Sequence, residues 1–343
     1  MFSSELHESS GFHLPVDLAV IGLLGQGTYG LVACCVNKCG TKYALKKVDV
    51  KDKKSSLREI QFLEHFTKLC SGTKYLAHVV ELINSYECQK FDYIMLEYME
   101  TDLGRIIYSN QPLTSIQIMY ILIQILQGIR IIHAAEVVHR DIKPANLLLN
   151  LDCSLKIGDF GLSRKISVDE KAQDDSSLSR YVATLWYRAP EVLLEGRYSF
   201  PMDMWSIGCI FAEMLHRHAL FEGKNQVHQI GCIIGTIGTP NQQEIESVVP
   251  RDFCDVMKRK FFENRMRFTR SFSTVQFSLD VQFRETSSLA RDLLKALLTF
   301  NQDQRITAVE ALQDIYFKPI CWLSRSFIEC DMSRIALFGS EKL

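Results

Sequence analysis

Apolar residues change their spacing near residue 100. From about Leu18 to Glu100 they alternate with polar residues or form short runs, which is the pattern of strands in a β-sheet. One passage in this part, Ser56 to Leu69, has helical spacing. Its Leu57, Ile60 and Leu63 form the face that we expect to dock on the strands. The first hundred residues are therefore predicted to form mostly strands with one helix.

Helical spacing dominates the rest of the chain. The predicted helices are Leu113 to His133, Pro201 to Leu215, Val227 to Gly235, Ser287 to Phe300 and Thr307 to Ile315. Polar residues interrupt the most apolar segment, Ile116 to Ile132, so we predict a buried helix there and not a membrane span. A chain of 343 residues is long enough for a strand-rich part and a helical part, each with its own core.

Charge and cysteine content narrow the class of protein only slightly. Lysine and arginine number 39 and acidic residues 40, so the chain gives no reason to expect nucleic acid or an anionic membrane as its partner. Eleven cysteines at irregular spacing, without a secretory leader, favour reduced thiols inside the cell. Cys34, Cys35 and Cys39 lack the spacing of a zinc site, and we expect buried strand cysteines there.

A glycine-rich stretch, Gly25 to Gly30 with the sequence GQGTYG, is the first candidate for chemistry. Dinucleotide-binding domains use the same glycine spacing, but there it opens a helix. Here a strand-like run follows, and then Lys46. A glycine-rich turn between strands, followed by a lysine on a strand, is the arrangement that brings backbone amides and an ammonium group to the phosphates of a nucleotide. An isolated lysine would more often be a solvated surface residue.

The densest group of polar residues lies between His139 and Gly161, in HRDIKPANLLLNLDCSLKIGDFG. Phosphoryl transfer needs a carboxylate to orient a hydroxyl, a cation near the transferred phosphate and oxygen ligands for magnesium. This stretch offers Asp141, Lys143 and Asn146, and then Asp159 after a strand-like run. The spacing matches the catalytic loop and the magnesium-binding turn of protein kinases.

These motifs make the chain resemble a eukaryotic Ser/Thr protein kinase of the CMGC group from about residue 18 to 317. The phrases METDL, YVATLWYRAPEVLL, SIGCIFAEML and LLTFNQDQRIT make it most similar to the mitogen-activated protein (MAP) kinases, with the cyclin-dependent kinases as near neighbours. The resemblance implies an α+β fold of two lobes. A β-rich N-lobe would span 18–100 and an α-helical C-lobe 101–317, with extensions at 1–17 and 318–343.

The implied reaction is the transfer of phosphate from ATP, with Mg²⁺, to serine or threonine. By resemblance, Asp141 would orient the substrate hydroxyl and Lys143 would steady the γ-phosphate, while Asn146 and Asp159 would hold magnesium. A kinase-fold scaffold without activity is the first alternative, although the residues that such chains usually lose are present. A dinucleotide-dependent enzyme is the weaker alternative, because it depends on the glycine motif alone.

The resemblance also assigns the nucleotide site and its supports. The residues implied to bind ATP are Leu24, Gly25, Gln26, Gly27, Thr28, Tyr29, Gly30, Val32, Ala44, Lys46, Glu59, Glu97 and Met99. Glu59 would pair with Lys46 and so orient its ammonium group on the α- and β-phosphates. Asp203 is expected to brace the catalytic loop. Glu191 is expected to pair with Arg305.

The activation segment carries Ser179 and Tyr181 where MAP kinases have a Thr-x-Tyr pair. A phosphate on Ser179 would add roughly two negative charges, and Arg58, Arg140 and Arg164 stand at the positions that bind such a phosphate in the family. We therefore expect phosphorylation of Ser179 by an upstream kinase to activate the enzyme.

Two more positions shape the expected regulation and specificity. Leu185 replaces an arginine that usually binds the phosphotyrosine, so a phosphate on Tyr181 would keep only Arg188 as a partner. Arg188 would also occupy the backbone groups that otherwise accept the amide of the residue after the phosphoacceptor. Proline has no amide hydrogen to leave unsatisfied, so substrates with Ser-Pro or Thr-Pro sites are expected.

Regulatory partners and location are less constrained. The tail after Phe317 has few acidic residues, so the acidic docking patch of MAP kinases is not evident. The helix sequence SSLREI differs from the sequence that well-known cyclin partners bind, and a cyclin-type partner stays open. We expect the protein in the cytoplasm, the nucleus or both.

Overall fold

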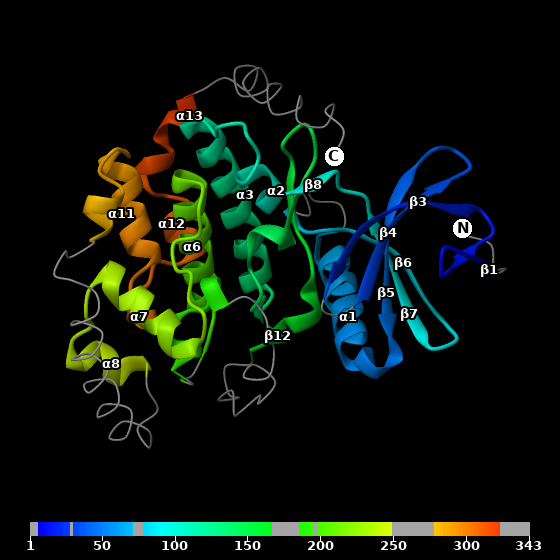
Figure 1. Ribbon diagram of the computed structural model, residues 1–343, viewed down its shortest axis with the longest axis horizontal. Helices are drawn as coiled ribbons and strands as arrows, with labels where there is room; N and C mark the ends of the chain where they lie inside the picture. Colours follow the sequence, from blue (N-terminus) through cyan, green and yellow to red (C-terminus); the bar gives the residue numbers. More distant parts are fainter. Residues whose placement is uncertain are drawn as a thin grey trace.

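The computed structural model describes residues 6–27, 30–70, 78–166, 185–194, 196, 198–248 and 278–322. Its described part has two lobes, a β-sheet lobe and a larger helical lobe (Figure 1). The division confirms the α+β architecture expected from the change in apolar spacing.

The N-lobe is built on a five-stranded antiparallel sheet with the order β3-β4-β5-β7-β6. Its strands are β3 (Leu18–Gly27), β4 (Gly30–Asn37), β5 (Lys42–Asp49), β6 (Leu82–Cys88) and β7 (Phe91–Glu97). In this register Lys46 lies opposite Val32 on one side and Ile94 on the other. The central position of β5 fixes the backbone of the lysine that the sequence singled out.

A short hairpin of β1 (Leu6–Ser9) and β2 (Phe12–Pro15) packs on this sheet. Phe12 and Leu14 are fully buried in a small core with residues of β5 and β7, and the Tyr86 hydroxyl donates to the carbonyl of His13 at 2.8 Å. The region predicted as an N-terminal extension, 1–17, thus includes a hairpin that shares the N-lobe core.

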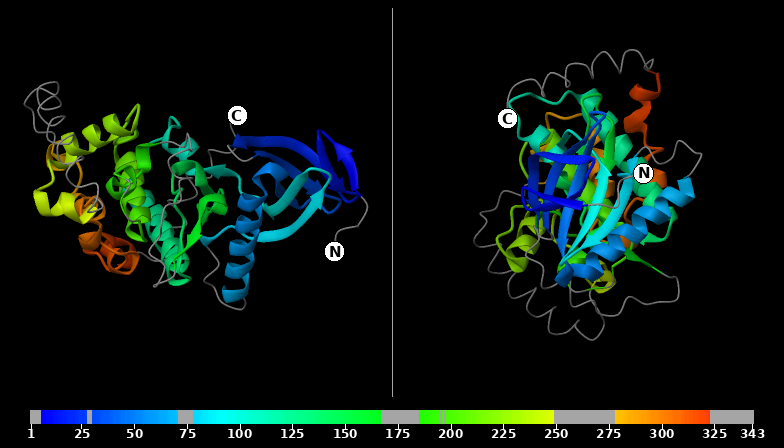
Figure 2. Two further views of the ribbon diagram at one scale, coloured as in Figure 1. Left: turned by 90° about the horizontal axis from the view of Figure 1, so that it is seen from below. Right: turned by 90° about the vertical axis from the view of Figure 1, so that its right-hand side faces the viewer.

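Helix α1 (Lys53–Cys70) packs on the sheet face opposite the hairpin, as Figure 2 shows from two further sides. Glu59, Leu63 and Phe66 are buried on its inner side. The prediction that Leu57 docks on the strands is wrong, because this side chain is 44% exposed. The buried face follows the spacing 56, 59, 63, 66, and position 57 lies about 100° away from position 56 around the helix.

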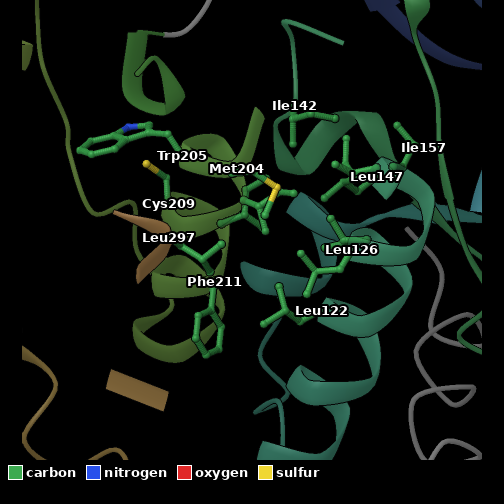
Figure 3. Close-up of a cluster of buried hydrophobic side chains, with 14 of the residues drawn as sticks. Leu122, Leu126, Ile142, Leu147, Ile157, Met204, Trp205, Cys209, Phe211 and Leu297 are labelled. Atoms are coloured by element: carbon green, nitrogen blue, oxygen red, sulfur yellow. The ribbon is translucent and has the colours of Figure 1, made fainter. Parts of the chain in front are cut away.

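The C-lobe is organised around two long helices, α3 (Ser115–Ala134) and α6 (Pro201–His216). Every residue of α6 from Met202 to Met214 is buried. Leu122 and Leu126 of α3 lie in one cluster with Met204 of α6 (Figure 3). In length and composition α3 could cross a membrane, yet 56% of its apolar window is buried in the protein, as expected for a core helix.

Shorter elements surround this helix pair. They are β8 (Thr101–Asp102), α2 (Leu103–Ile107), β9 (Val137–Val138), β10 (Leu147–Leu149), β11 (Leu155–Ile157), β12 (Arg164–Lys165), α5 (Pro190–Leu193), α7 (Gln226–Ile237), α8 (Gln242–Val248), α10 (Leu279–Gln282), α11 (Ser288–Leu297), α12 (Ala308–Ala311) and α13 (Lys318–Trp322). Strands β8, β10 and β11 form a small sheet, and β10 and β11 lie between the loop that includes Asp141 and the turn at Asp159.

The two lobes are joined by contacts of Ile157 and Lys156 in β11 as well as through the chain crossing. The Val80 amide donates to the carbonyl of Ile157 at 3.0 Å, and Val79 forms a parallel bridge with the same residue. Lys156 forms an ion pair of 2.6 Å with Glu97, at the end of β7. Strand β11 of the lower lobe is therefore tied to the N-lobe at two neighbouring points.

Candidate active site

The catalytic loop is anchored on a carboxylate of α6. Asp203 is fully buried and accepts hydrogen bonds from the backbone amides of His139 and Arg140, both at 2.9 Å. His133 Nε2 lies 2.9 Å from the same carboxylate. Burial acts to raise the pKa of Asp203, but the hydrogen bond and charge of His133 outweigh it and lower the pKa. The bracing role expected for Asp203 is confirmed in these contacts.

Two polar side chains of the loop, Lys143 and Asn146, converge on Asp141. Lys143 Nζ lies 2.7 Å from Asp141 Oδ2, and Asn146 Nδ2 donates to the same oxygen at 3.0 Å. Asn146 also donates to the Asp141 backbone carbonyl at 2.8 Å. These bonds hold the carboxylate of Asp141 in one orientation, with an ammonium group beside it.

A second charged group joins the lobes across the cleft. Lys46 Nζ lies 2.8 Å from Glu59 Oε2 and 2.8 Å from Asp159 Oδ1. Burial opposes the charge of Lys46, but the two carboxylates outweigh it and raise its pKa. Burial raises the pKa of Glu59, whereas at Asp159 the charge of Lys46 overcomes burial and lowers the pKa. The pairing of Lys46 with Glu59 is thus formed, as the sequence predicted.

The turn that carries Asp159 is packed from both lobes. Asp159 has a left-handed backbone with φ of 62°, and the next side chain, Phe160, is fully buried. Its ring centroid lies 5.2 Å from that of Phe66 on α1 and 4.9 Å from that of His139. The Gly161 carbonyl then accepts from Ser55 Oγ of α1 at 3.1 Å. Helix α1 therefore positions Asp159 through its neighbours as well as through Lys46.

The glycine-rich turn that is predicted to bind ATP joins β3 to β4. Gly30 has φ of +152°, and a Cβ there would lie 1.9 Å from the carbonyl oxygen of Lys47, so only glycine fits. A Cβ on Gly25 would meet nothing within 4 Å. Thr28 and Tyr29 lie outside the described residues, and for Gln26 and Gly27 only the backbone is described.

Two residues predicted to bind ATP, Glu97 and Met99, lie at the end of β7 and just after it. The Glu97 side chain accepts from the Glu81 amide at 2.6 Å and from Lys156 at 2.6 Å, so it serves the connection between the lobes. Any contact between Glu97 and the nucleotide would therefore come from its backbone. Ala44 is paired with Leu96 in the sheet, and Met99 is buried nearby in sequence.

The three arginines predicted to bind the phosphate, Arg58, Arg140 and Arg164, contact different groups in this structure. Arg58 donates to the Gly161 carbonyl at 2.9 Å, and Arg164 donates to the Ser163 carbonyl at 2.9 Å. The Arg140 guanidinium lies 4.8 Å from the ring centroid of Tyr198. The two residues predicted to carry phosphate, Ser179 and Tyr181, lie outside the described residues. The structure therefore leaves the phosphate receptor as a prediction.

The residues present fit a magnesium nucleotide. Asn146 and Asp159 offer amide and carboxylate oxygens, which suit Mg²⁺. The described parts of the chain hold no group of three or more His, Cys, Asp or Glu that could bind a metal. Mg²⁺ commonly takes one or two protein ligands and completes its shell with phosphates and water, so two ligands are enough.

Sequence reasoning missed several contacts that support the site. Ser55 at Gly161, Lys156 at Glu97, and a carboxylate on α6 held by two tyrosines all join segments far apart in the chain. The phrase SIGCIFAEML includes this carboxylate, Glu213, but nothing in its local pattern identifies the tyrosines.

Lys46, which joins the two lobes, and Asp203, which holds the backbone of the catalytic loop, form the arrangement of a protein kinase. Comparison with known proteins agrees: the protein kinase domain model matches residues 18–317. The chain is 40% identical to mitogen-activated protein kinase spk1 of Schizosaccharomyces pombe, over 89% of this chain and 79% of the yeast protein. It is 38% identical to mitogen-activated protein kinase 1 of Oryza sativa subsp. japonica, over 89% of this chain and 75% of that one.

A third relative is longer. Extracellular signal-regulated kinase 1 of Dictyostelium discoideum is 37% identical over 95% of this chain, which spans 61% of that relative. The chain belongs to the protein kinase family and, within it, to the MAP kinases, and it is a serine/threonine protein kinase. Enzymes of this family use ATP, typically with Mg²⁺, act on proteins and are switched by upstream kinases.

Proposed function

We propose that this kinase transfers phosphate from ATP to serine or threonine followed by proline. The observation that carries the proposal is that the Lys46–Asp159 pair and the Lys143–Asp141 pair belong to one site. Lys46 contacts Asp159, and Lys143 contacts Asp141. The charge of Lys143 also helps to lower the pKa of Asp159. An acceptor hydroxyl near Asp141 and a phosphate near Lys143 would thus lie side by side.

Each residue has a defined task in this proposal. Asp141 orients the acceptor hydroxyl and takes up its proton, because its carboxylate is fixed by Lys143 and Asn146. Lys143 balances charge on the transferred phosphate, and Lys46 orients the nucleotide phosphates. Asn146 and Asp159 would hold the magnesium, which neutralises phosphate charge when bound. The ATP pocket would be completed by the glycine-rich turn, Val32, Ala44 and the backbone from Glu97 to Met99.

The preference for proline is supported by the position of Arg188. Burial lowers the pKa of Arg188, while the charge of Asp141 acts to raise it. A substrate residue next to the acceptor would meet this segment. An amide there without a partner costs about 1–3 kcal/mol, which proline avoids.

A pair of matched peptides tests this specificity. Enzyme isolated from its native cells after stimulation is offered one peptide with Ser-Pro and one with Ser-Ala, and γ-phosphate transfer is measured. We expect kcat/KM to be at least about 10-fold higher for Ser-Pro, the scale of one unsatisfied amide. Asp141→Asn serves as the inactive control. Equal rates for the two peptides would remove proline direction, and absence of transfer from both would favour the scaffold alternative.

We further propose that phosphorylation of Ser179 by an upstream kinase activates the enzyme, with Arg58, Arg140 and Arg164 as the receptor and Arg188 as the remaining partner for phosphate on Tyr181. The phosphate would have to compete with the Gly161 carbonyl for Arg58. Because an ionised phosphate accepts stronger hydrogen bonds than a carbonyl, the exchange is favourable.

Replacement at the two sites of the activation segment separates their roles. Ser179→Ala should abolish most activity of enzyme from stimulated cells, whereas Tyr181→Phe should reduce it less. Full activity of Ser179→Ala would contradict the switch. Activity that appears only with an added partner protein would favour the cyclin-type alternative. We expect the enzyme to act in the cytoplasm, the nucleus or both, on protein substrates.

A further inference from the structure

A buried carboxylate in the C-lobe is held by two tyrosines from separate parts of the chain. Glu213 of α6 has 0% exposure. The Tyr108 hydroxyl donates to Glu213 Oε1 at 2.6 Å, and the Tyr187 hydroxyl donates to Oε2 at 2.8 Å. Both carboxylate oxygens therefore have a phenol as a partner. The chemistry described for the active site uses none of these three residues.

Tyr187 lies in a short turn that packs on α6. It ends the 3₁₀ turn Leu185–Tyr187, and its carbonyl accepts from Ser206 Oγ of α6 at 2.8 Å. The next residue is Arg188, whose pKa is influenced by the charge of Asp141. Helix α6 thus holds the turn by its backbone through Ser206 and by its side chain through Glu213.

Tyr108 reaches the same carboxylate from a segment much earlier in the chain. It follows α2 (Leu103–Ile107), the first helix after the segment that joins the lobes. Its side chain is 56% exposed, yet its hydroxyl is directed at the buried Glu213. Arg217, just after α6, also donates to the carbonyl of Ser109. The end of α2 is therefore attached to the end of α6 by two contacts.

We propose that Tyr108 is a positioning residue for the peptide substrate, which acts through Glu213 to hold the Tyr187 turn in place. The inference rests on the proposed function, because it takes residues 185–188 as part of the peptide site. A carboxylate with two donors is fixed in orientation, and with one donor it gains freedom to turn away from Tyr187. Loss of the Tyr108 hydroxyl then loosens the turn without touching ATP or the catalytic loop.

The charge state of Glu213 provides an independent readout. Burial raises the pKa of Glu213, while the hydrogen bonds from Tyr108 and Tyr187 act to lower it. His218 and Glu222 are the other titratable groups that influence it, with opposite signs. Removal of one hydroxyl therefore makes the carboxyl easier to protonate, and a protonated carboxyl is a poorer acceptor for Tyr187.

Tyr108→Phe is the first variant to examine, because the side chain is half exposed and the ring is kept. We expect KM for a Ser-Pro peptide to rise about 3- to 10-fold, the effect of one charge-assisted hydrogen bond, with kcat and KM for ATP changed less than about 2-fold. The acid limb of kcat/KM for the peptide should move to higher pH. Glu213→Gln should raise the peptide KM further.

Tyr86→Phe is the matched control. It also removes one tyrosine hydroxyl, which donates to the His13 carbonyl in the N-lobe, away from the peptide site. This variant should leave the peptide KM and its pH profile unchanged. If Tyr108→Phe behaves in the same way as Tyr86→Phe while remaining folded, the proposal is overturned.

Hydrogen exchange separates this proposal from the proposed function, since it needs no substrate. In Tyr108→Phe the amides of 185–194 should exchange faster than in the wild type, whereas in Tyr86→Phe they should not. Unchanged exchange at these amides would overturn the positioning role even if the wild type proved proline-directed. Faster exchange would support it even if the wild type showed no preference for proline.

Discussion

Two buried ion pairs in this kinase differ in how completely their charges are satisfied. Arg305 and Glu191 in the C-lobe have side chains with 0% exposure and are joined by two bonds of 2.7 and 3.0 Å. The other N–H groups of Arg305 donate to the carbonyls of Thr299, Pro201 and Phe300. Each of the five N–H groups of the guanidinium thus has an acceptor. Such a pair is fixed in one geometry.

The pair in the cleft is built for exchange. Lys46 is a point charge between Glu59 of α1 and Asp159, which comes from the other lobe. An ammonium group rotates freely and, in the proposed mechanism, would keep one carboxylate while it releases the other for a phosphate. On that proposal, the C-lobe has an arginine where contacts stay fixed, and the site between the lobes has a lysine where contacts would change during each catalytic cycle.

The largest expected effect comes from the exchangeable pair. Asp159→Asn should lower kcat by about 10³-fold or more, because in the proposed mechanism its carboxylate would hold the magnesium that neutralises phosphate charge. Lys46 would keep Glu59 as its partner, so the variant should stay folded. Steady-state phosphate transfer and thermal unfolding of the same preparations measure both quantities. A folded variant with more than a tenth of the wild-type rate would contradict the role of Asp159.

Disruption of the Arg305–Glu191 pair should lower the stability of the protein but not its catalytic rate. Glu191→Gln leaves the charge of Arg305 buried without a counter-ion, and we expect the free energy of unfolding to fall by about 3–5 kcal/mol. The kcat of the protein that remains folded should change little. Unfolding in urea measures the loss. A loss below about 1 kcal/mol would show that the C-lobe tolerates the uncompensated charge.

Replacement of Asp203, which holds the catalytic loop, should have an intermediate effect on the free energy of unfolding, and this effect should depend on pH. The pKa of Asp203 is lower in the folded protein than its ordinary value of 3.8, so its charged form stabilises the fold above that value. This contribution decreases as pH falls from about 5 through the folded pKa. Asp203→Asn should cost about 2 kcal/mol at pH 7, the scale of a hydrogen bond to a charged group.

The comparison of wild type and Asp203→Asn is made in urea at several pH values between 7 and 3. The difference in stability should stay constant down to about pH 5 and then narrow, because the wild type loses its advantage as Asp203 takes up a proton. A difference that widens as the pH falls would mean that the folded pKa is raised.

The smallest effect is expected at an exposed pair. Lys53 and Glu87 lie 2.8 Å apart, but their side chains are 40% and 53% exposed. Lys53→Ala should change the free energy of unfolding by no more than about 0.5 kcal/mol, and less in high salt. If Lys53→Ala lowered the free energy of unfolding as much as Glu191→Gln does, burial could not explain why the two ion pairs contribute differently to stability.

The sequence was most informative where a period or a motif extended over many residues. Helix α6 runs Pro201–His216 against a prediction of Pro201 to Leu215, because proline suits the first helical position and the apolar pattern continues to the end. The contact between Lys46 and Glu59 could be predicted because the motif fixes both elements. Helix α12 was predicted too long, since the chain passes into a 3₁₀ turn at Ile315–Phe317.

Contacts between distant segments without a shared motif could not be predicted. Tyr108 and Glu213 are 105 positions apart and meet only because α2 and α6 end at the same place. The hairpin in the first 17 residues was missed because its strands have four residues each, too few for a period to stand out. Leu57 was misplaced because three apolar residues at regular spacing did not define which side of the helix was buried.

The bond between Val80 and Ile157 connects the chain just before β6 to β11 of the other lobe. β6 is one edge of the five-stranded sheet, and β3, which leads into the glycine-rich turn, is the opposite edge. If the lobes rotate about this connection, the glycine-rich turn moves farther than β6, because displacement grows with distance from the axis. The width of the sheet would then set how far the turn travels for a given rotation.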